Sequence, residues 1–297
     1  MKPVLLIGAS GLVGTDMFSY LVKENINLFG TSRKGMLKSN ATNFIKADIL
    51  NGGDEILKLV DEVDCIILNA GEINDGKNFE DLEALRIVNM DFASRLSKKA
   101  LESGGKTLIY IGSLSILARP LQSLIRESDP ISPATPYAVS KFWAEKSILS
   151  INNLRNCRSI VLRISSPVPK HFENLGNTVL KKWINNALQN IPIAVHGKGE
   201  REQDFVSVSD ISQAIKISIY NKNISGIFHI ASGKSLSMAK LAEIIDGEFH
   251  NGIRYEQEVN KNVEKWRISI DKAGKELDYV PIFDSESVVR DLIQTLL

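Results

Sequence analysis

The stretch VLLIGASGLVG, residues 4–14, joins a run of apolar residues to three regularly spaced glycines. An amphipathic segment, residues 12–23, follows, so the glycines lie between an expected buried strand and an expected helix. Glycine permits a tight turn and close approach of the backbone to a phosphate, and a helix N-terminus supplies free amides and the positive end of its dipole. The spacing G-x-x-G-x-x-G therefore predicts a dinucleotide-binding turn at Gly8, Gly11 and Gly14.

Short apolar runs alternate with amphipathic segments through the first half of the chain. The expected strands are PVLLIG, NLFGTS, NFIKAD, VDCIILNAG, KTLIYIGS and SIVLRIS. Runs this continuously apolar are typical of strands buried on both faces, as in a parallel sheet covered by helices on both sides. The sequence predicts an α/β fold with a Rossmann-type, doubly wound parallel sheet.

The alternating pattern changes after Arg163, where SSPVPKHFENLG is rich in proline and polar residues. A helical stretch and mixed strand and loop signals follow, and regular alternation then returns in ISQAIKISIY and GIFHIAS. We expect residues 1–165 to form the dinucleotide-binding domain, with 204–233 returning to it. Residues 166–203 and 234–297 are expected to form a smaller, mixed substrate-binding region.

The composition restricts the partners of the protein. The chain has 297 residues, 36 Lys and Arg against 35 Asp and Glu, and 43% apolar residues. This balance favours neither nucleic acid nor an anionic membrane, and no apolar stretch approaches the length that spans a bilayer. The two cysteines, Cys65 and Cys157, lie in or beside apolar runs, so neither a disulfide framework nor a metal site is supported. We expect a cytoplasmic protein without a metal.

The end of the second expected strand reads GTSRK. An acidic residue there would accept from the 2′-hydroxyl of an adenosine ribose, whereas a cation accommodates a 2′-phosphate. Ser32 and Arg33 stand where an aspartate is common, so the sequence favours NADP(H) over NAD(H). A solvated loop charge at Arg33 would leave NAD as the alternative.

The stretch SPATPYAVSKFWAEK, residues 132–146, predicts a helix with a tyrosine and a lysine on one face. Thr135 is suited to cap the free amides, Pro136 suits the first helical position, and no helix breaker follows up to Lys146. Tyr137 and Lys141 are four residues apart and share a face. Taken alone, the pair is weak evidence, because an isolated Y-x-x-x-K usually belongs to an ordinary surface helix.

The motifs together resemble the extended short-chain dehydrogenase/reductases, in the NAD(P)-dependent sugar epimerase/dehydratase group. The resemblance covers nearly the whole chain and rests on GASGLVG, KADI, LNAG, VNM, YIGSLS, PYAVSK, LRISSPV and the late segments QDFVSVSDISQAI, GIFHIASGKSLSMAKLAEII and ISIDKAGKELDYVP. It implies a catalytic set of Ser113, Tyr137 and Lys141, with Asn89 in the active-site scaffold. The implied cofactor residues are Gly8, Ser10, Gly11, Leu12, Val13, Gly14, Ser32, Arg33, Asp48, Ile49, Asn69, Ala70, Gly71, Tyr137, Lys141, Ser166 and Val168.

The implied chemistry gives the tyrosine and lysine distinct tasks. Tyr137 exchanges a proton with the substrate oxygen, but an ordinary phenol, with a pKa near 10, is a slow partner at neutral pH. The Lys141 ammonium is expected to favour the phenolate and to bind the nicotinamide ribose. Ser113 is expected to hold the substrate oxygen. Ser115, on the same face of an extended strand, is the second candidate for that role.

One position departs from the family pattern. Many relatives that act on nucleotide sugars carry an arginine directly before the aspartate of an RDF-like motif, and here Gln203 stands in that place, in REQDFV. Arg201 is a possible substitute. Ser115, Arg201 and Gln203 are therefore the expected substrate contacts, and the diphosphate assignment depends on the geometry at Arg201.

The resemblance implies an NADP(H)-dependent oxidoreductase that transfers a hydride to or from a keto-sugar, which we expect to be nucleotide-linked. The alternatives are a nucleotide-sugar 4-epimerase with tightly bound NAD and a non-catalytic NADP-sensing regulatory protein. Relatives pair through helices that correspond to residues 79–101 and 137–151, so a homodimer is expected.

Overall fold

We describe the protein from a computed structural model, which covers residues 2–33, 44–117, 124–257 and 263–297. Within these residues, seven parallel strands form one sheet in the order β12-β7-β5-β4-β1-β2-β3. The strand bounds are β1 (Val4–Ile7), β2 (Leu28–Ser32), β3 (Phe44–Lys46), β4 (Cys65–Leu68), β5 (Thr107–Ser113), β7 (Arg158–Ile164) and β12 (Gly226–Ile230). The strand order reverses at β1, as in Rossmann-type sheets, so the predicted fold class is confirmed.

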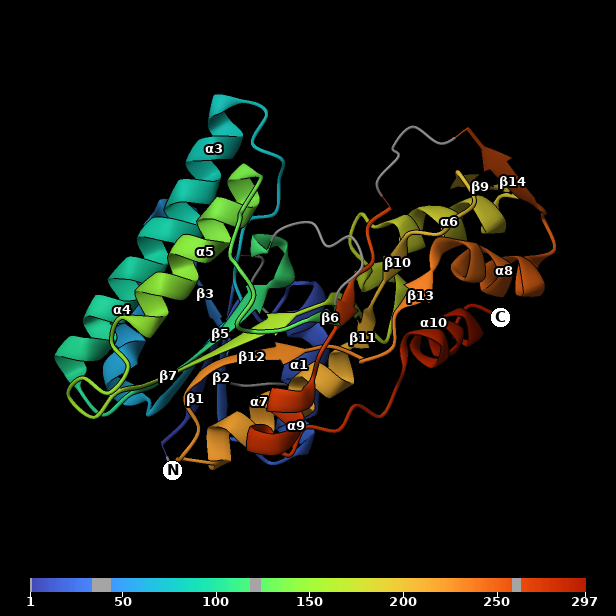
Figure 1. Cartoon of the computed structure of the whole chain (residues 1–297). Coiled ribbons are helices and arrows are strands. Elements are labelled where there is room, and N and C mark those ends of the chain that lie inside the picture. The colour runs from blue at the N-terminus through green and yellow to red at the C-terminus, as the bar shows by residue number, and fades with distance from the viewer. Residues whose placement is uncertain (1, 34–43, 118–123, 258–262) are drawn as a thin grey trace.

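Helices cover both faces of the sheet (Figure 1). Helices α1 (Leu12–Lys23), α7 (Val208–Tyr220) and α9 (Asp271–Leu277) pack on one face, and α4 (Phe92–Ser103) and α5 (Pro136–Leu149) cover the other. Successive side chains of a strand point to opposite faces. In β1, Leu6 accordingly packs with the first group, while Leu5 and Ile7 pack with the second.

The helix expected over residues 79–101 has an irregular centre. It begins as α3 (Phe79–Leu85), continues as a π-helical segment η3 (Arg86–Asp91) and ends as α4. Widened turns of this kind are rare and frequently accompany functional sites. Asn89 lies in η3 and is therefore turned differently from a residue of a regular helix.

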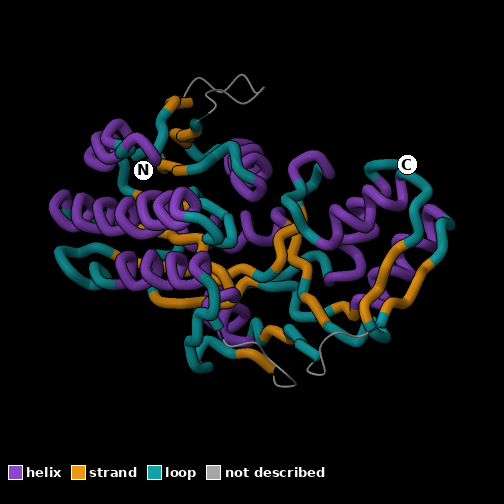
Figure 2. The backbone as a smooth tube through the Cα atoms, turned by 90° about the horizontal axis from the view of Figure 1, so that it is seen from above, coloured by secondary structure: helices purple, strands orange, loops and turns teal. Residues whose placement is uncertain are grey.

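The remaining elements form a smaller group beside the sheet (Figure 2). Helices α6 (Val179–Leu188), α8 (Met238–Phe249) and α10 (Ser285–Gln294) share one apolar core. The strand pairs around them are β9 (Ile193–His196) with β14 (Ile253–Glu256), β10 (Glu202–Gln203) with β13 (Leu236–Ser237), and β8 (Ser166–Val168) with β11 (Phe205–Ser207). Between these elements the chain returns to the main sheet as β12.

Short elements complete the connections. They are α2 (Asp54–Lys58), the 3₁₀ segments η1 (Ile49–Asn51), η2 (Leu59–Glu62), η4 (Leu114–Ile116) and η5 (Phe172–Asn174), and the pair of β6 (Leu124–Ile125) with β15 (Arg267–Ile268). In the part of the chain that the structure describes, we find no helix with the length and apolar content required to span a bilayer.

Candidate active site

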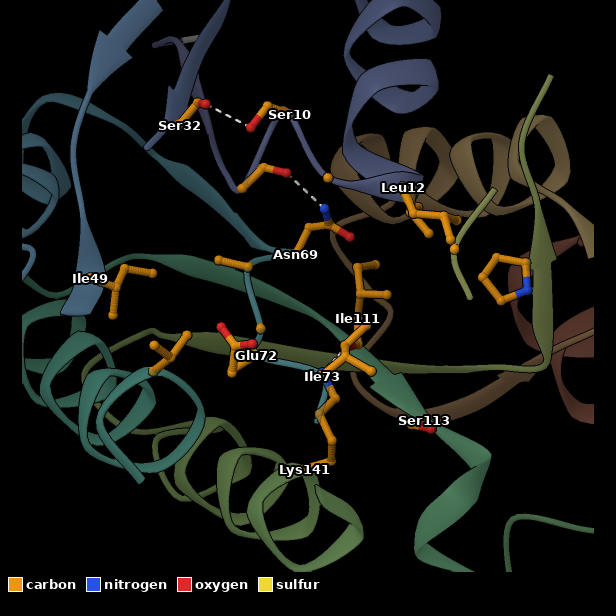
Figure 3. Close-up of a pocket in the computed structure, with 18 of the residues that line it drawn as sticks. Ser10, Leu12, Ser32, Ile49, Asn69, Glu72, Ile73, Ile111, Ser113 and Lys141 are labelled. Carbon is orange, nitrogen blue, oxygen red and sulfur yellow. Dashed lines mark hydrogen bonds between the residues drawn. The ribbon is translucent and has the colours of Figure 1, made fainter. Parts of the chain in front are cut away.

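A cavity of about 400 Å³ opens where the sheet strands end. It lies between the ends of β1, β2, β4 and β5 and the first turns of α5, and the segment that follows β7 closes one side. The predicted residues that line it are Gly8, Ser10, Gly11, Leu12, Val13, Ser32, Arg33, Asp48, Ile49, Asn69, Ala70, Gly71, Ser113, Tyr137 and Lys141. Figure 3 shows Ser10 and Ser32 at one end of this cavity and Ser113 with Lys141 at the other.

The glycine-rich turn between β1 and α1 has no space for side chains at two positions. Gly8 adopts a φ of +87°, and a Cβ atom there would lie 2.6 Å from the Ala70 nitrogen. A Cβ atom on Gly14 would lie 2.1 Å from the Gly8 oxygen. Gly14 therefore packs directly against the backbone of the turn, and it does not line the cavity. The Asn69 side-chain amide donates to the Gly8 oxygen at 2.9 Å and joins the end of β4 to the turn. This exposed backbone cradle fits a dinucleotide phosphate.

The end of β2 carries hydroxyls and a cation. The Ser32 hydroxyl donates to the Ser10 hydroxyl at 2.6 Å, and Arg33 is exposed at the edge of the cavity. Residues 31–33 include no carboxylate, while Lys34 lies outside the described residues. The nearby Asp48 carboxylate lines the cavity and accepts from the Leu50 amide at 3.1 Å, which fixes the start of η1.

The start of α5 follows the predicted local chemistry. The Thr135 hydroxyl accepts from the Ala138 amide at 3.1 Å, and Pro136 is the first helical residue. Tyr137 and Lys141 consequently face the cavity together from the first turns of the helix. The Lys141 ammonium donates to the Ile111 oxygen of β5 at 2.9 Å and lies 4.5 Å from the centre of the Tyr110 ring.

Burial determines the titration of the tyrosine and the lysine. It lowers the pKa of the Lys141 ammonium to about 7, while the negative charge of Glu145 acts in the opposite direction. Burial also raises the pKa of the Tyr137 phenol, and hydrogen bonding with Ser113 lowers it. The sequence led us to expect Lys141 to lower the tyrosine pKa. In the structure Ser113 is the residue with that effect, and burial outweighs it.

The two candidate serines differ in position. Ser113 is the last residue of β5 and lines the cavity, whereas Ser115 does not. The chain leaves the extended conformation after Ser113 and forms η4, so the expectation that Ser115 shares its strand face is wrong. The Ser113 hydroxyl donates to the Ser115 hydroxyl at 2.9 Å and accepts from the Ser115 amide at 3.2 Å. Ser115 therefore orients Ser113.

Asn89 is buried behind the cavity, where it connects two elements of the site. Its side-chain oxygen accepts from the Glu72 amide at 2.8 Å, and its amide donates to the Glu72 oxygen at 3.0 Å and to the Ser140 hydroxyl at 2.8 Å. The loop after β4 is thereby fixed to α5 directly beside Lys141. Asn89 belongs to the scaffold of the site and does not line the cavity.

Similarity to known proteins extends over most of the chain. The model of the NAD-dependent epimerase/dehydratase family matches residues 4–231. The chain belongs to this family. It is 26% identical over 306 residues to a putative UDP-glucose 4-epimerase of Methanocaldococcus jannaschii, covering 98% of this chain and 97% of that protein. It is 24% identical over 306 residues to a dTDP-4-dehydro-6-deoxyglucose reductase of Escherichia coli, covering 99% and 97%.

The fold agrees with solved structures of the epimerase/dehydratase family. The UDP-glucuronic acid 4-epimerase of Bacillus cereus, solved with UDP-glucuronic acid and NAD, superposes with a TM-score of 0.85 at 18% identity, covering 99% of this chain and 100% of that one. At this identity the likeness shows the shared fold. The family match and the sequence relatives identify the chain as an enzyme of the extended short-chain dehydrogenase/reductase type.

In the segment after β7, the residues that line the cavity lie one position before the predicted ones. Ser166 and Val168 do not line the cavity, whereas Ser165 and Pro167 do. Alternate residues of β8 point to opposite sides, and Val168 lies in the apolar core of the smaller group. Thr31, which precedes Ser32 at the end of β2, also lines the cavity. The sequence carries no signal for other lining residues, which include Glu72, Ile73, Gly176, Asn177 and Thr178.

Arg201 and Gln203 lie outside the cavity, beside and within β10 of the smaller group. The Arg201 guanidinium donates to the Gln203 side-chain oxygen at 2.6 Å and lies 3.7 Å from the Glu264 carboxylate. The Gln203 amide in turn donates to the Ser166 hydroxyl of β8. At the position where many members of the family carry an arginine, this chain therefore has Gln203, whose side-chain amide is hydrogen-bonded to Arg201.

Proposed function

We propose that this chain is an NADP(H)-dependent oxidoreductase that transfers a hydride to or from the carbonyl carbon of a keto-sugar, with a nucleotide-linked sugar as the substrate. The observation that carries the proposal is one cavity that has the phosphate-binding turn at one end and Ser113, Tyr137 and Lys141 at the other. This distribution fits a dinucleotide whose reactive ring reaches the second end.

Each residue of the catalytic end has a task in carbonyl reduction. The bound dinucleotide supplies the hydride that adds to the carbonyl carbon. Tyr137 gives its proton to the carbonyl oxygen, and the raised pKa of its phenol keeps that proton in place at neutral pH. Ser113 donates a hydrogen bond to the same oxygen. Lys141 holds the nicotinamide ribose, and in the reverse direction Tyr137 accepts the proton.

The relatives support a sugar nucleotide as the substrate class. Their names specify UDP-glucose epimerisation and reduction of a dTDP-linked dehydro sugar. Arg201, which is hydrogen-bonded to Gln203, is the cation that we propose to bind the substrate diphosphate. The epimerase alternative uses the same tyrosine and lysine but returns the hydride to the same sugar.

The bound nucleotide of the purified protein tests the proposal and separates it from the epimerase. Protein prepared without added cofactor is denatured, and the released dinucleotide is identified by mass spectrometry. A dissociating reductase is expected to release little, and to bind added NADPH in titration. Stoichiometric NAD in the purified protein would instead support the epimerase, and failure to bind any dinucleotide would reject both.

Arg33→Ala is expected to weaken NADPH binding by about 1.5–3 kcal/mol, because it removes a charge-assisted contact to the 2′-phosphate. NADH affinity is expected to change little. The measurement is a fluorescence titration of both reduced cofactors, with Arg290→Ala, an exposed arginine of α10, as the matched control. Equal losses for NADPH and NADH would contradict the assignment of Arg33.

We further propose a homodimer through α3 and α5. Large apolar side chains are exposed on these helices, including Phe79 (74%), Trp143 (52%) and Val139 (45%). Phe79→Glu is expected to convert a dimer into a monomer in light scattering at micromolar concentration, because it places a charge in the apolar contact. Ile282→Glu, at a residue 71% exposed elsewhere on the surface, is the control and should remain dimeric. A monomeric wild-type chain would rule out this assembly.

A further inference from the structure

A buried ion pair lies one helical turn beyond the catalytic lysine. Both carboxylate oxygens of Glu145, in α5, accept from the Arg163 guanidinium of β7, at 2.9 Å from Nε and 2.7 Å from Nη2. Each of the two side chains is only 1% exposed. A pair so deeply buried is costly to desolvate and is by itself weak evidence for a stabilising role. Its position next to Lys141 suggests another reason for its presence.

Lys141 requires electrostatic support to carry a charge at this depth. Its side chain is 6% exposed, and its ammonium has a carbonyl oxygen as its hydrogen-bond acceptor. Glu145 lies four residues further along α5, on the same helix face, and its negative charge is the one that opposes the effect of burial. Among the described residues, Tyr137 and Glu72 line the cavity with Lys141, Tyr110 lies against its ammonium, and Arg163 binds Glu145.

In the part of the chain that the structure describes, the side-chain hydrogen bonds of Arg163 both go to Glu145. Across β7 and β12, Arg163 is the register partner of His229, and burial lowers the pKa of that imidazole to about 3, so His229 is neutral and adds no second positive charge beside Arg163. Arg163 Nη1 and both His229 ring nitrogens have no hydrogen-bond partner among the described residues. The two bonds to Glu145 therefore fix the carboxylate on the helix face that it shares with Lys141.

We propose that Glu145, held in place by Arg163, is a positioning residue that keeps Lys141 protonated in its buried site. Without a carboxylate one turn away, burial would favour the neutral amine, and the lysine would lose the charge that binds a ribose hydroxyl. The inference rests on the proposed function for the task of Lys141. It assigns no contact with substrate or cofactor to Glu145 or Arg163.

The test is the pH dependence of NADPH affinity, measured by fluorescence titration from acidic to alkaline pH. In the wild type, affinity is expected to fall as pH rises through about 7, because Lys141 then loses its proton. In Glu145→Gln the midpoint of this fall should move to lower pH by about one unit or more, with affinity retained at acidic pH. A merely structural defect would instead reduce affinity at every pH.

Two further variants keep the test decisive. Glu145→Met/Arg163→Met removes both charges while filling the space, so it gives the answer if Glu145→Gln does not fold. Arg158→Met is the control, because this partly buried arginine of the same strand binds only backbone oxygens and a threonine hydroxyl and should leave the midpoint unchanged. A wild-type midpoint in folded Glu145→Gln or in the double variant would overturn the proposal. Absence of NADPH binding by the wild type would instead reject the proposed function.

Discussion

Tyr137→Phe is expected to lower kcat by about 10²–10⁴-fold, because general acid–base catalysis typically contributes that much. The substitution keeps the ring and deletes only the hydroxyl, so packing at the start of α5 should persist. NADPH affinity should remain close to that of the wild type, because the glycine-rich turn, Arg33 and Lys141 are untouched. The measurement is steady-state turnover of NADPH with the true substrate, together with a binding titration.

The control for this variant is Tyr279→Phe. Tyr279 is a buried tyrosine whose hydroxyl donates to the Ala231 oxygen at 3.0 Å, outside the cavity. Its loss should affect stability and leave kcat near the wild-type value. If Tyr137→Phe folded, bound NADPH and turned over at the wild-type rate, Tyr137 would be an ordinary helix residue and the catalytic account would fail.

Arg163→Met is expected to reduce the free energy of unfolding by about 3–5 kcal/mol, because it leaves the Glu145 carboxylate buried without its partner. The double variant Glu145→Met/Arg163→Met should be close to the wild type in stability, since apolar side chains of similar volume then replace both charges. Urea unfolding followed by circular dichroism measures both values.

The comparison between the single and double variants is the informative result. An exposed ion pair would cost less than about 1 kcal/mol in either variant. A double variant as unstable as Arg163→Met would show that packing, rather than the unpaired charge, accounts for the loss. In that case the pair could not be treated as an electrostatic unit acting on Lys141.

Local chemistry made much of the fold predictable. The spacing of the glycines predicts the turn from one short segment, and the structure shows Gly8 and Gly14 to be too crowded for a Cβ atom. The Thr135 cap and Pro136 likewise define the start of α5 within a few residues. Continuously apolar strands indicate a parallel sheet without any knowledge of distant contacts.

The remaining features depend on contacts between distant segments. Whether Ser166 or Ser165 faces the cavity is a matter of strand register, which β8 takes from its pairing with β11. Ser115 does not line the cavity, because η4 begins directly after Ser113. The Glu145 and Arg163 pair forms between a helix and a strand 18 residues apart in sequence, and neither residue carries a local signal of the partner.

The proposed cofactor choice and the proposed substrate rest on residues in short segments, Arg33 at the edge of the cavity and Arg201 outside it. Arg33 and the Ser10–Ser32 pair carry the NADP(H) proposal, whereas the family is described as NAD-dependent. Gln203 stands in place of the arginine common among relatives, and we propose that Arg201, which donates to Gln203, supplies the positive charge. These positions belong to loops and short strands, where members of one fold differ most.

Transfer of deuterium from labelled NADPH tests the central claim most directly. The protein is incubated with NADPH that carries deuterium at the reactive nicotinamide carbon and with a panel of nucleotide-linked keto-sugars, and the products are analysed by mass spectrometry. We predict one deuterium on the former carbonyl carbon of one keto-sugar, one NADP⁺ formed per product, and loss of both in Tyr137→Phe. Interconversion of sugar epimers without net consumption of NADPH, or no uptake of deuterium by any sugar although NADPH binds, would contradict the proposed reductase.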